Sequence, residues 1–75
     1  MQTDSTKSIE INAEPIALYQ ILKLEALVSS GGEAKAVIDD GQVLVNGEVE
    51  TRRRKKILSG DIVEFAGERF SILLK

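Results

Sequence analysis

The chain has 75 residues, with 10 Lys+Arg against 12 Asp+Glu, a formal net charge of -2, and 43% hydrophobic residues. This length is typical of one small globular domain, whose core leaves no room for a large enclosed active site. Cysteine and histidine are both absent, which excludes disulfides, thiolate nucleophiles, iron–sulfur clusters and nearly all zinc sites. The side chain most used for acid–base catalysis near neutral pH is therefore missing. We expect no enzyme, no catalytic residue, no metal and no cofactor.

Residues 1–8 are polar and lack the apolar stretch of a signal peptide. No apolar run approaches the roughly 20 residues of a membrane span. We therefore expect a cytoplasmic protein with no membrane partner and no small-molecule substrate. Residues 1–75 are expected to form a single domain, with residues 1–7 as a loose N-terminus.

The first elements in chain order are a short strand and a helix. Residues 6–11 alternate apolar with polar side chains, which predicts the strand. Asn12 is a suitable N-cap for the helix, Glu14 would lie in its first turn, and Pro15 fits only an early helical position. The apolar residues that follow recur three and four positions apart and share one face: Leu18, Ile21 and Leu22.

A second, short helix is predicted after residues 29–32, with Ser30 or a glycine as its N-cap and Gly41 as its stop. Its apolar face holds Ala34, Val37 and Ile38. From residue 42 the period changes to two. Residues 43–45 and 48–51 predict a hairpin about Asn-Gly, and residues 62–65 and 69–73 predict another. Two helices followed by short antiparallel strands indicate an α+β fold.

The charge is unevenly distributed along these elements. Residues 1–51 hold three basic and nine acidic residues, and residues 57–75 hold two basic and three acidic. Between them lie five consecutive cations: Arg52, Arg53, Arg54, Lys55 and Lys56. Adjacent like charges repel one another and favour an anionic partner. If the segment is extended, alternate side chains point the same way, so Arg52, Arg54 and Lys56 would share one face.

Residues 29–47 read Ser-Ser-Gly-Gly-Glu-Ala-Lys-Ala-Val-Ile-Asp-Asp-Gly-Gln-Val-Leu-Val-Asn-Gly. They resemble the S4 RNA-binding domain, with its serine-led turn, its Ala-Lys pair, and Gly-x-Val-x-Val-Asn-Gly. Residues 59–63, Ser-Gly-Asp-Ile-Val, resemble the later turn and strand of that family. Residues 22–25 and 30–35 are similar to small stand-alone bacterial S4 proteins.

The resemblance covers about residues 14–65. It implies the S4-like alpha-L fold, in which two short helices pack on a small, mostly antiparallel sheet. It also implies binding of structured RNA, ribosomal or transfer RNA, and a partnership with the ribosome.

The resemblance also indicates where RNA would bind. Lys35 matches the basic residue of the family's second helix, and Lys23 lies between the two helical segments. We predict that both converge with the cationic run on one surface, although each alone is also an ordinary solubility lysine. The predicted RNA-binding residues are Lys23, Lys35, Arg52, Arg53, Arg54, Lys55 and Lys56. Five phosphate contacts on a single strand would give a salt slope of about -3.5.

Two further features flank the second helix. Free N–H groups at Ser30, Gly31 and Gly32 favour a phosphate, although a flexible cap explains the same residues. Gly31 stands where many S4 domains carry an arginine. Asp39 and Asp40 also depart from the family pattern, and their spacing on a helix makes no catalytic pair. They predict either a solvated helix end or repulsion of nucleic acid from one side.

Three aromatic residues are present, and both phenylalanines lie in strands that need a core. Recognition by base stacking is therefore not favoured, and contacts to backbone and shape are. The alternative to RNA binding is a protein-interaction module that docks the basic segment on an acidic protein partner.

Overall fold

The computed structural model describes residues 6–75, and its main sheet has five strands in the order β1-β7-β6-β3-β4. The strands are β1 (Thr6–Ile11), β3 (Val43–Val45), β4 (Glu48–Val49), β6 (Ile62–Phe65) and β7 (Glu68–Leu74). Only β1 and β7 pair in parallel within the described residues, and the other neighbours are antiparallel.

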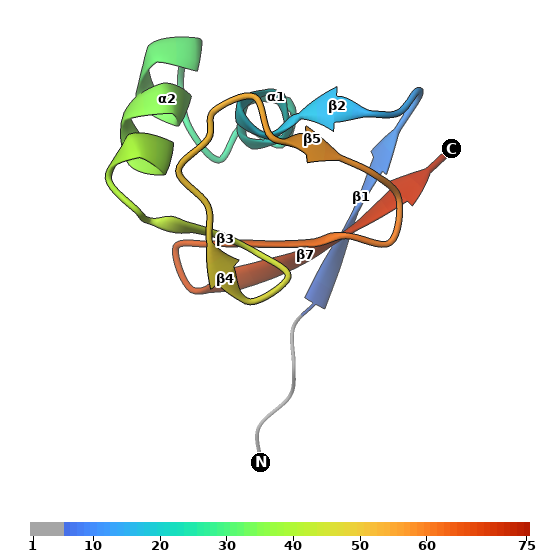
Figure 1. Cartoon of the computed structure of the whole chain (residues 1–75). Coiled ribbons are helices and arrows are strands. Elements are labelled where there is room, and N and C mark those ends of the chain that lie inside the picture. The colour runs from blue at the N-terminus through green and yellow to red at the C-terminus, as the bar shows by residue number, and fades with distance from the viewer. Residues whose placement is uncertain (1–5) are drawn as a thin grey trace.

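Two helices lie on one side of this sheet, α1 (Leu18–Leu24) and α2 (Gly31–Asp39), as Figure 1 shows. The same side carries a second small sheet of β2 (Ile16–Ala17) and β5 (Lys56–Ile57). The predicted α+β fold, with two short helices on a mostly antiparallel sheet, is confirmed. Within residues 6–75, no helix has the length and apolar character that crossing a membrane requires.

The core lies between the helices and the main sheet. Alternate strand residues point toward the helices, as the two-residue period of a strand requires. The buried apolar side chains are Ile9, Ile11, Leu18, Ile21, Leu22, Val28, Ala34, Ile38, Val43, Val45, Ile57, Val63, Phe70 and Ile72. The predicted faces of both helices are therefore correct, except that Val37 is only half-buried.

Helix α1 begins at Leu18, so the prediction of a helix capped by Asn12 is wrong. Residues 12–15 instead lead into β2, whose two residues pair with β5. The Glu14 carboxylate accepts a hydrogen bond from the backbone N–H of Ser59 at 2.7 Å, rather than lying in a first helical turn. Pairing with a distant strand and loop has overridden a local helix-start signal, which is only a weak preference.

The predicted loose N-terminus also needs correction. Residues 1–5 lie outside the described residues, but Thr6 and Lys7 are the first two residues of β1. They pair with Arg69 and Phe70 of β7, and the Lys7 ammonium lies 3.1 Å from the Glu68 carboxylate. Strand pairing therefore orders this segment from its sixth residue.

The predicted caps and turns of the second half are correct. The Ser30 hydroxyl accepts the N–H of Glu33 at 3.1 Å and caps α2, and Gly41 ends the helix with φ at 79°. Asn46 and Gly47 have φ of 53° and 86°, the left-handed pair that a tight hairpin turn requires.

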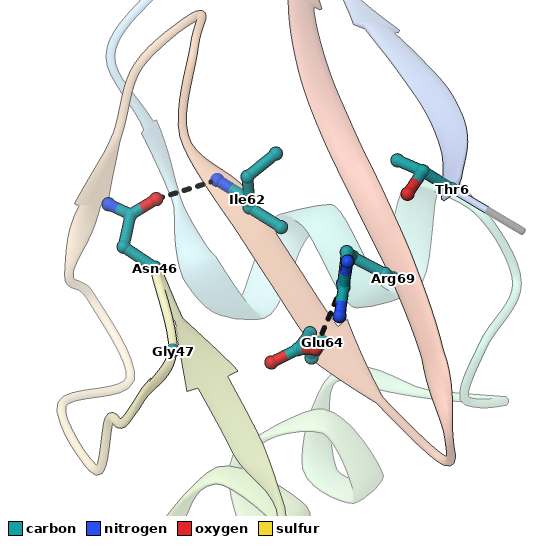
Figure 2. Close-up of a pocket in the computed structure, with 6 residues that line it drawn as sticks. All are labelled: Thr6, Asn46, Gly47, Ile62, Glu64 and Arg69. Carbon is teal, nitrogen blue, oxygen red and sulfur yellow. Dashed lines mark hydrogen bonds and ion pairs between the residues drawn. The ribbon is translucent and has the colours of Figure 1, made fainter. Parts of the chain in front are cut away.

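Asn46 does more than allow the hairpin turn. Its side-chain oxygen accepts the backbone N–H of Ile62 at 2.9 Å, a bond visible in Figure 2. Its side-chain amide donates to the Asp61 carboxylate at 3.2 Å. The turn between β3 and β4 is thereby joined to the start of β6.

Replacing Asn46 tests this connection between the β3–β4 turn and β6. Asn46→Ala should lower the free energy of unfolding by about 1–2 kcal/mol, because it removes two side-chain hydrogen bonds and disfavours the positive φ. Asn46→Gly keeps the backbone conformation and should lose less. Urea denaturation measures both, and an alanine variant as stable as the wild type would contradict the assignment.

Candidate nucleic-acid interface

The basic segment, residues 52–56, lies against the N-terminus of α1. The backbone N–H of Leu18 donates to the carbonyl oxygen of Lys55 at 2.9 Å, and that of Tyr19 donates to the carbonyl oxygen of Arg53 at 3.1 Å. The N-cap residue of α1 is Ala17, which offers no side-chain acceptor. The first N–H groups of a helix have no partner inside the helix, so the basic segment supplies it. Main-chain hydrogen bonds therefore fix where these cations lie.

Arg52 forms an ion pair with Glu50, two residues before it in the chain. Its guanidinium donates to both oxygens of the Glu50 carboxylate, at 2.8 and 3.2 Å, and its backbone N–H donates to the same carboxylate at 3.0 Å. The Glu50 side chain is only 13% exposed, whereas that of Arg52 is 71% exposed. These hydrogen bonds from Arg52, with the nearby charge of Lys55, lower the pKa of Glu50 to about 2.

Arg53 reaches in another direction, to the C-terminal end of α2. Its Nε donates to Oδ1 of Asp39 at 3.0 Å, and its Nη2 donates to Oδ2. The hydrogen bond from Arg53 lowers the pKa of the Asp39 carboxyl, and the same contact raises the pKa of Arg53. Asp39 is thus an ion-pair partner of the basic segment, which neither of the two roles predicted for it anticipated. Asp40 instead accepts a hydrogen bond from the Gln42 side chain.

The other three cations of the segment form its free charge. None of Arg54, Lys55 and Lys56 has an ion-pair partner in the part of the chain that the structure describes. Together with Arg52 they line a shallow hollow of about 370 Å³. Arg52, Arg54 and Lys56 therefore share a surface as predicted. Lys55 joins them because the chain turns at residues 53–54 instead of staying extended.

Of the two predicted lysines, Lys23 lies on α1 and Lys35 on α2. Lys35 is half-buried, and its Nζ lies 5.4 Å from the centre of the Tyr19 ring. A cation over an aromatic face at this distance is attracted by the ring. Lys23 follows Tyr19 by four residues, so the two side chains lie on the same face of the helix.

The Lys23 side chain lies beside Gly31 at the start of α2. A Cβ added at Gly31 would be 3.6 Å from the Cδ of Lys23. The missing side chain of Gly31 thus leaves space along which Lys23 extends. Lys23 is in the last turn of α1, at the opposite end of the helix from the basic segment. Lys23 lines a separate hollow with Ile16, Gln20 and Leu24, whereas four cations of the basic segment share theirs. The convergence of all the predicted cations on one surface therefore stays a prediction.

The N-terminus of α2 carries a carboxylate as well as N–H groups. Ser30 caps the helix, and Gly31 and Gly32 form its first turn. The Glu33 carboxylate accepts the N–H of Ser29 at 2.8 Å and its hydroxyl at 2.7 Å, and these bonds lower the pKa of Glu33. The negative charge of Glu33 opposes an incoming phosphate at this helix end.

Another open pocket, of about 460 Å³, lies on the face of the main sheet that the helices leave uncovered (Figure 2). Its lining residues come from β1, β6, β7 and the turn after β3: Thr6, Asn46, Gly47, Ile62, Glu64 and Arg69. The polar groups of Asn46 are bonded, and Arg69 is ion-paired with Glu64 at 3.1 Å. Neither side chain is therefore free to receive a ligand there, and the basic hollow remains the better candidate site.

Comparison with known proteins identifies the fold. A family model described as S4 domain matches residues 9–73. YbcJ of Escherichia coli is 47% identical over 58 residues, which are 77% of this chain and 83% of YbcJ. Its solution structure, described as revealing an ALFAL motif involved in RNA binding, aligns with a TM-score of 0.65 at 41% identity, covering 97% of this chain and 91% of YbcJ.

Two other relatives have names that concern RNA or the ribosome. RlbA of Bacillus subtilis, named a probable ribosome maturation protein, is 46% identical over 59 residues, which are 79% of this chain and 83% of RlbA. The tyrosine–tRNA ligase of Ralstonia nicotianae is 33% identical over 66 residues, which are 88% of this chain but only 17% of the ligase.

The bonds to Glu50 predict a pH dependence of stability. Because the pKa of Glu50 is depressed from 4.5 to about 2, its carboxylate stabilises the folded state above about pH 4.5. This contribution is lost as the pH falls toward 2. Glu50→Gln should therefore lower the free energy of unfolding by about 1 kcal/mol from pH 7 down to about pH 4.5, and by progressively less as the pH falls from there toward 2.

Urea denaturation at a series of pH values measures this difference. Glu48→Gln, which removes an exposed carboxylate from the neighbouring strand β4, is the control and should leave the pH profile unchanged. Parallel profiles for the wild type and the Glu50 variant would contradict the assignment.

Proposed function

Because the chain belongs to the S4 domain family, we propose that it is a bacterial RNA-binding protein whose basic surface binds the phosphate backbone of structured RNA. The basic surface comprises Lys23, Lys35, Arg52, Arg53, Arg54, Lys55 and Lys56. The observation that carries the proposal is the hollow at the N-terminus of α1, where three cations without ion-pair partners among residues 6–75 are held by main-chain hydrogen bonds. Cations fixed in place bind phosphates without first having to be ordered.

The surroundings of these cations favour phosphate contacts over base contacts. Phe70 is buried in the core, and Phe65 packs against it. Tyr19 lies beneath Lys35 and also packs against the core. No aromatic ring is therefore presented as a platform on which bases stack. Arginine and lysine side chains at the surface suit the phosphates of a folded RNA, which is recognised largely by shape.

The relatives support a more specific proposal. RlbA, named a probable ribosome maturation protein, supports ribosomal RNA as the ligand, the ribosome as a partner and the cytoplasm as the location. The tyrosine–tRNA ligase supports transfer RNA as the other structured ligand. Neither YbcJ nor RlbA has a name that states a catalytic role, and we propose a binding protein rather than an enzyme.

The N-terminus of α2 is a secondary candidate contact. Gly31 and Gly32 are in its first turn, and the Lys23 side chain lies beside Gly31. A phosphate near Lys23 would meet the positive end of the helix dipole. Glu33 opposes that contact, so we place it after the basic segment in importance.

Paired charge removal tests the proposed site. Lys55→Gln/Lys56→Gln should weaken binding to purified ribosomal RNA and reduce the slope of log affinity against log salt by about 1.4–1.8, because each lost phosphate contact removes roughly 0.7–0.9. Lys7→Gln/Lys75→Gln removes the same charge from β1 and from the residue after β7, and should leave the slope nearly unchanged. Fluorescence anisotropy across a salt series measures both variants.

Two results would overturn the proposal. Equal slopes for the two double variants would remove the basic segment as the site. Retention of the cellular partner after ribonuclease treatment, with loss of that partner in Lys55→Gln/Lys56→Gln, would favour an acidic protein as the ligand. Crosslinking followed by sequencing of the bound RNA identifies which RNA it is, and unstructured poly(U) in the same assay tests the preference for structure.

A further inference from the structure

We propose that Arg53 is a positioning residue, whose ion pair with Asp39 holds the basic segment against α2 so that Arg54, Lys55 and Lys56 contact the RNA. This inference rests on the proposed RNA binding and divides the five cations into two roles. It removes Arg53 from the residues that contact phosphate directly.

The direction of the Arg53 side chain supports this division. Four of the five cations line the basic hollow, and Arg53 is the one that does not. Two of its guanidinium nitrogens are bonded to the two carboxylate oxygens of Asp39. This bidentate geometry is the stronger and more directional form of an ion pair. A phosphate would have to displace Asp39 before it could take the same two donors.

The position of Asp39 gives the pair a second reason to form. Asp39 is the last residue of α2, where the negative end of the helix dipole disfavours a carboxylate. The guanidinium of Arg53 compensates both the carboxylate and the exposed end of the helix. Asp39 is therefore unfavourable at the end of its own helix but forms a favourable ion pair with the basic segment.

Both the backbone and the side chain of Arg53 are hydrogen-bonded to a helix. Its carbonyl oxygen accepts the N–H of Tyr19 on α1, and its guanidinium binds Asp39 on α2. One residue of the segment thus bridges the two helices. Without the ion pair, the segment keeps its main-chain bonds to α1, the pairing of β5 with β2 and the contact of Arg52 with Glu50. Its turn at residues 53–54 loses its attachment to α2, and the cations of that turn must then be ordered when RNA binds. Such ordering weakens binding even when every phosphate contact is retained.

Charge alone makes the opposite prediction. Asp39→Asn removes a negative charge beside the basic surface and frees an arginine, so electrostatic attraction by itself would strengthen RNA binding. A positioning role requires that binding weakens. Both side chains of the pair are about half exposed, so the variant should fold normally.

The chain offers a matched control. Asp40→Asn makes the same change in net charge one residue away, but Asp40 is bonded to Gln42 and not to the basic segment. With purified ribosomal RNA, Asp39→Asn should weaken binding about threefold or more. Asp40→Asn should strengthen it by at most about twofold. Equal strengthening by both variants would overturn the inference.

A charge exchange separates position from charge. Arg53→Asp alone should weaken binding, and combining it with Asp39→Arg restores an ion pair at unchanged net charge. Recovery to within about twofold of the wild type is expected if the pair positions the segment. Binding by the exchanged variant that stays as weak as that of Arg53→Asp would mean that the arginine is needed at position 53 itself, and would overturn the inference.

A measurement on the free protein distinguishes failure of this inference from failure of RNA binding. The heteronuclear NOE of the backbone amides of residues 53 and 54 should fall in Asp39→Asn and not in Asp40→Asn, because only the first releases this turn from α2. If the wild type binds no RNA, the proposed function fails, whatever the NOE shows. If the wild type binds but the NOE values of the two variants agree, only the positioning role fails.

Discussion

The N-cap residue of helix α1 provides no side-chain acceptor, and backbone carbonyl oxygens of the basic segment take its place. The position of the five cations depends on this interaction. The first N–H groups of α1 bond to carbonyl oxygens of Arg53 and Lys55, which come from a segment far along the chain. The cations are therefore carried by a piece of backbone that the helix needs. Their side chains can be replaced without disturbing this main-chain contact, whereas removing the segment would leave buried helix donors without acceptors.

The same arrangement concentrates the charge. Of the five consecutive cations, Arg52 and Arg53 are paired with Glu50 and Asp39. The free positive charge of the basic segment is then confined to the neighbouring Arg54, Lys55 and Lys56. Lys23 on α1 and Lys35 on α2 lie outside this segment. A protein with a net charge of -2 can in this way carry a local concentration of positive charge among acidic residues.

The sequence was most informative where the structural signal was local. The Ser30 cap, the left-handed Asn46 and Gly47 pair and the alternation of residues 6–11 all depend on neighbours along the chain, and each prediction proved correct. The cationic run could also be identified directly from the sequence. Its role in capping α1 could not be predicted, because the acceptors are backbone carbonyl oxygens, which every residue has.

Contacts between distant segments explain the errors. The Asn12 helix start was plausible by propensity, yet β2 pairs with β5 and delays the helix to Leu18. Asp39 and Arg53 are separated by 14 positions, so only the folded chain brings them together. The pairing of Arg52 with Glu50, two residues away, is the one part of this charge network that spacing along the chain alone suggests.

The parallel pairing of β1 with β7 has a consequence for how the protein is made. Thr6 lies opposite Arg69 and Ile11 opposite Leu74, so the first strand finds its partner only when the last has been synthesised. Contacts between such distant segments slow folding, because a large loop must close before they form. Contacts between neighbouring segments, such as the pairing of β3 with β4, can form before this loop closes. The edge of the sheet stays open until translation reaches β7, and the final closure of the domain is therefore a late step in its biosynthesis.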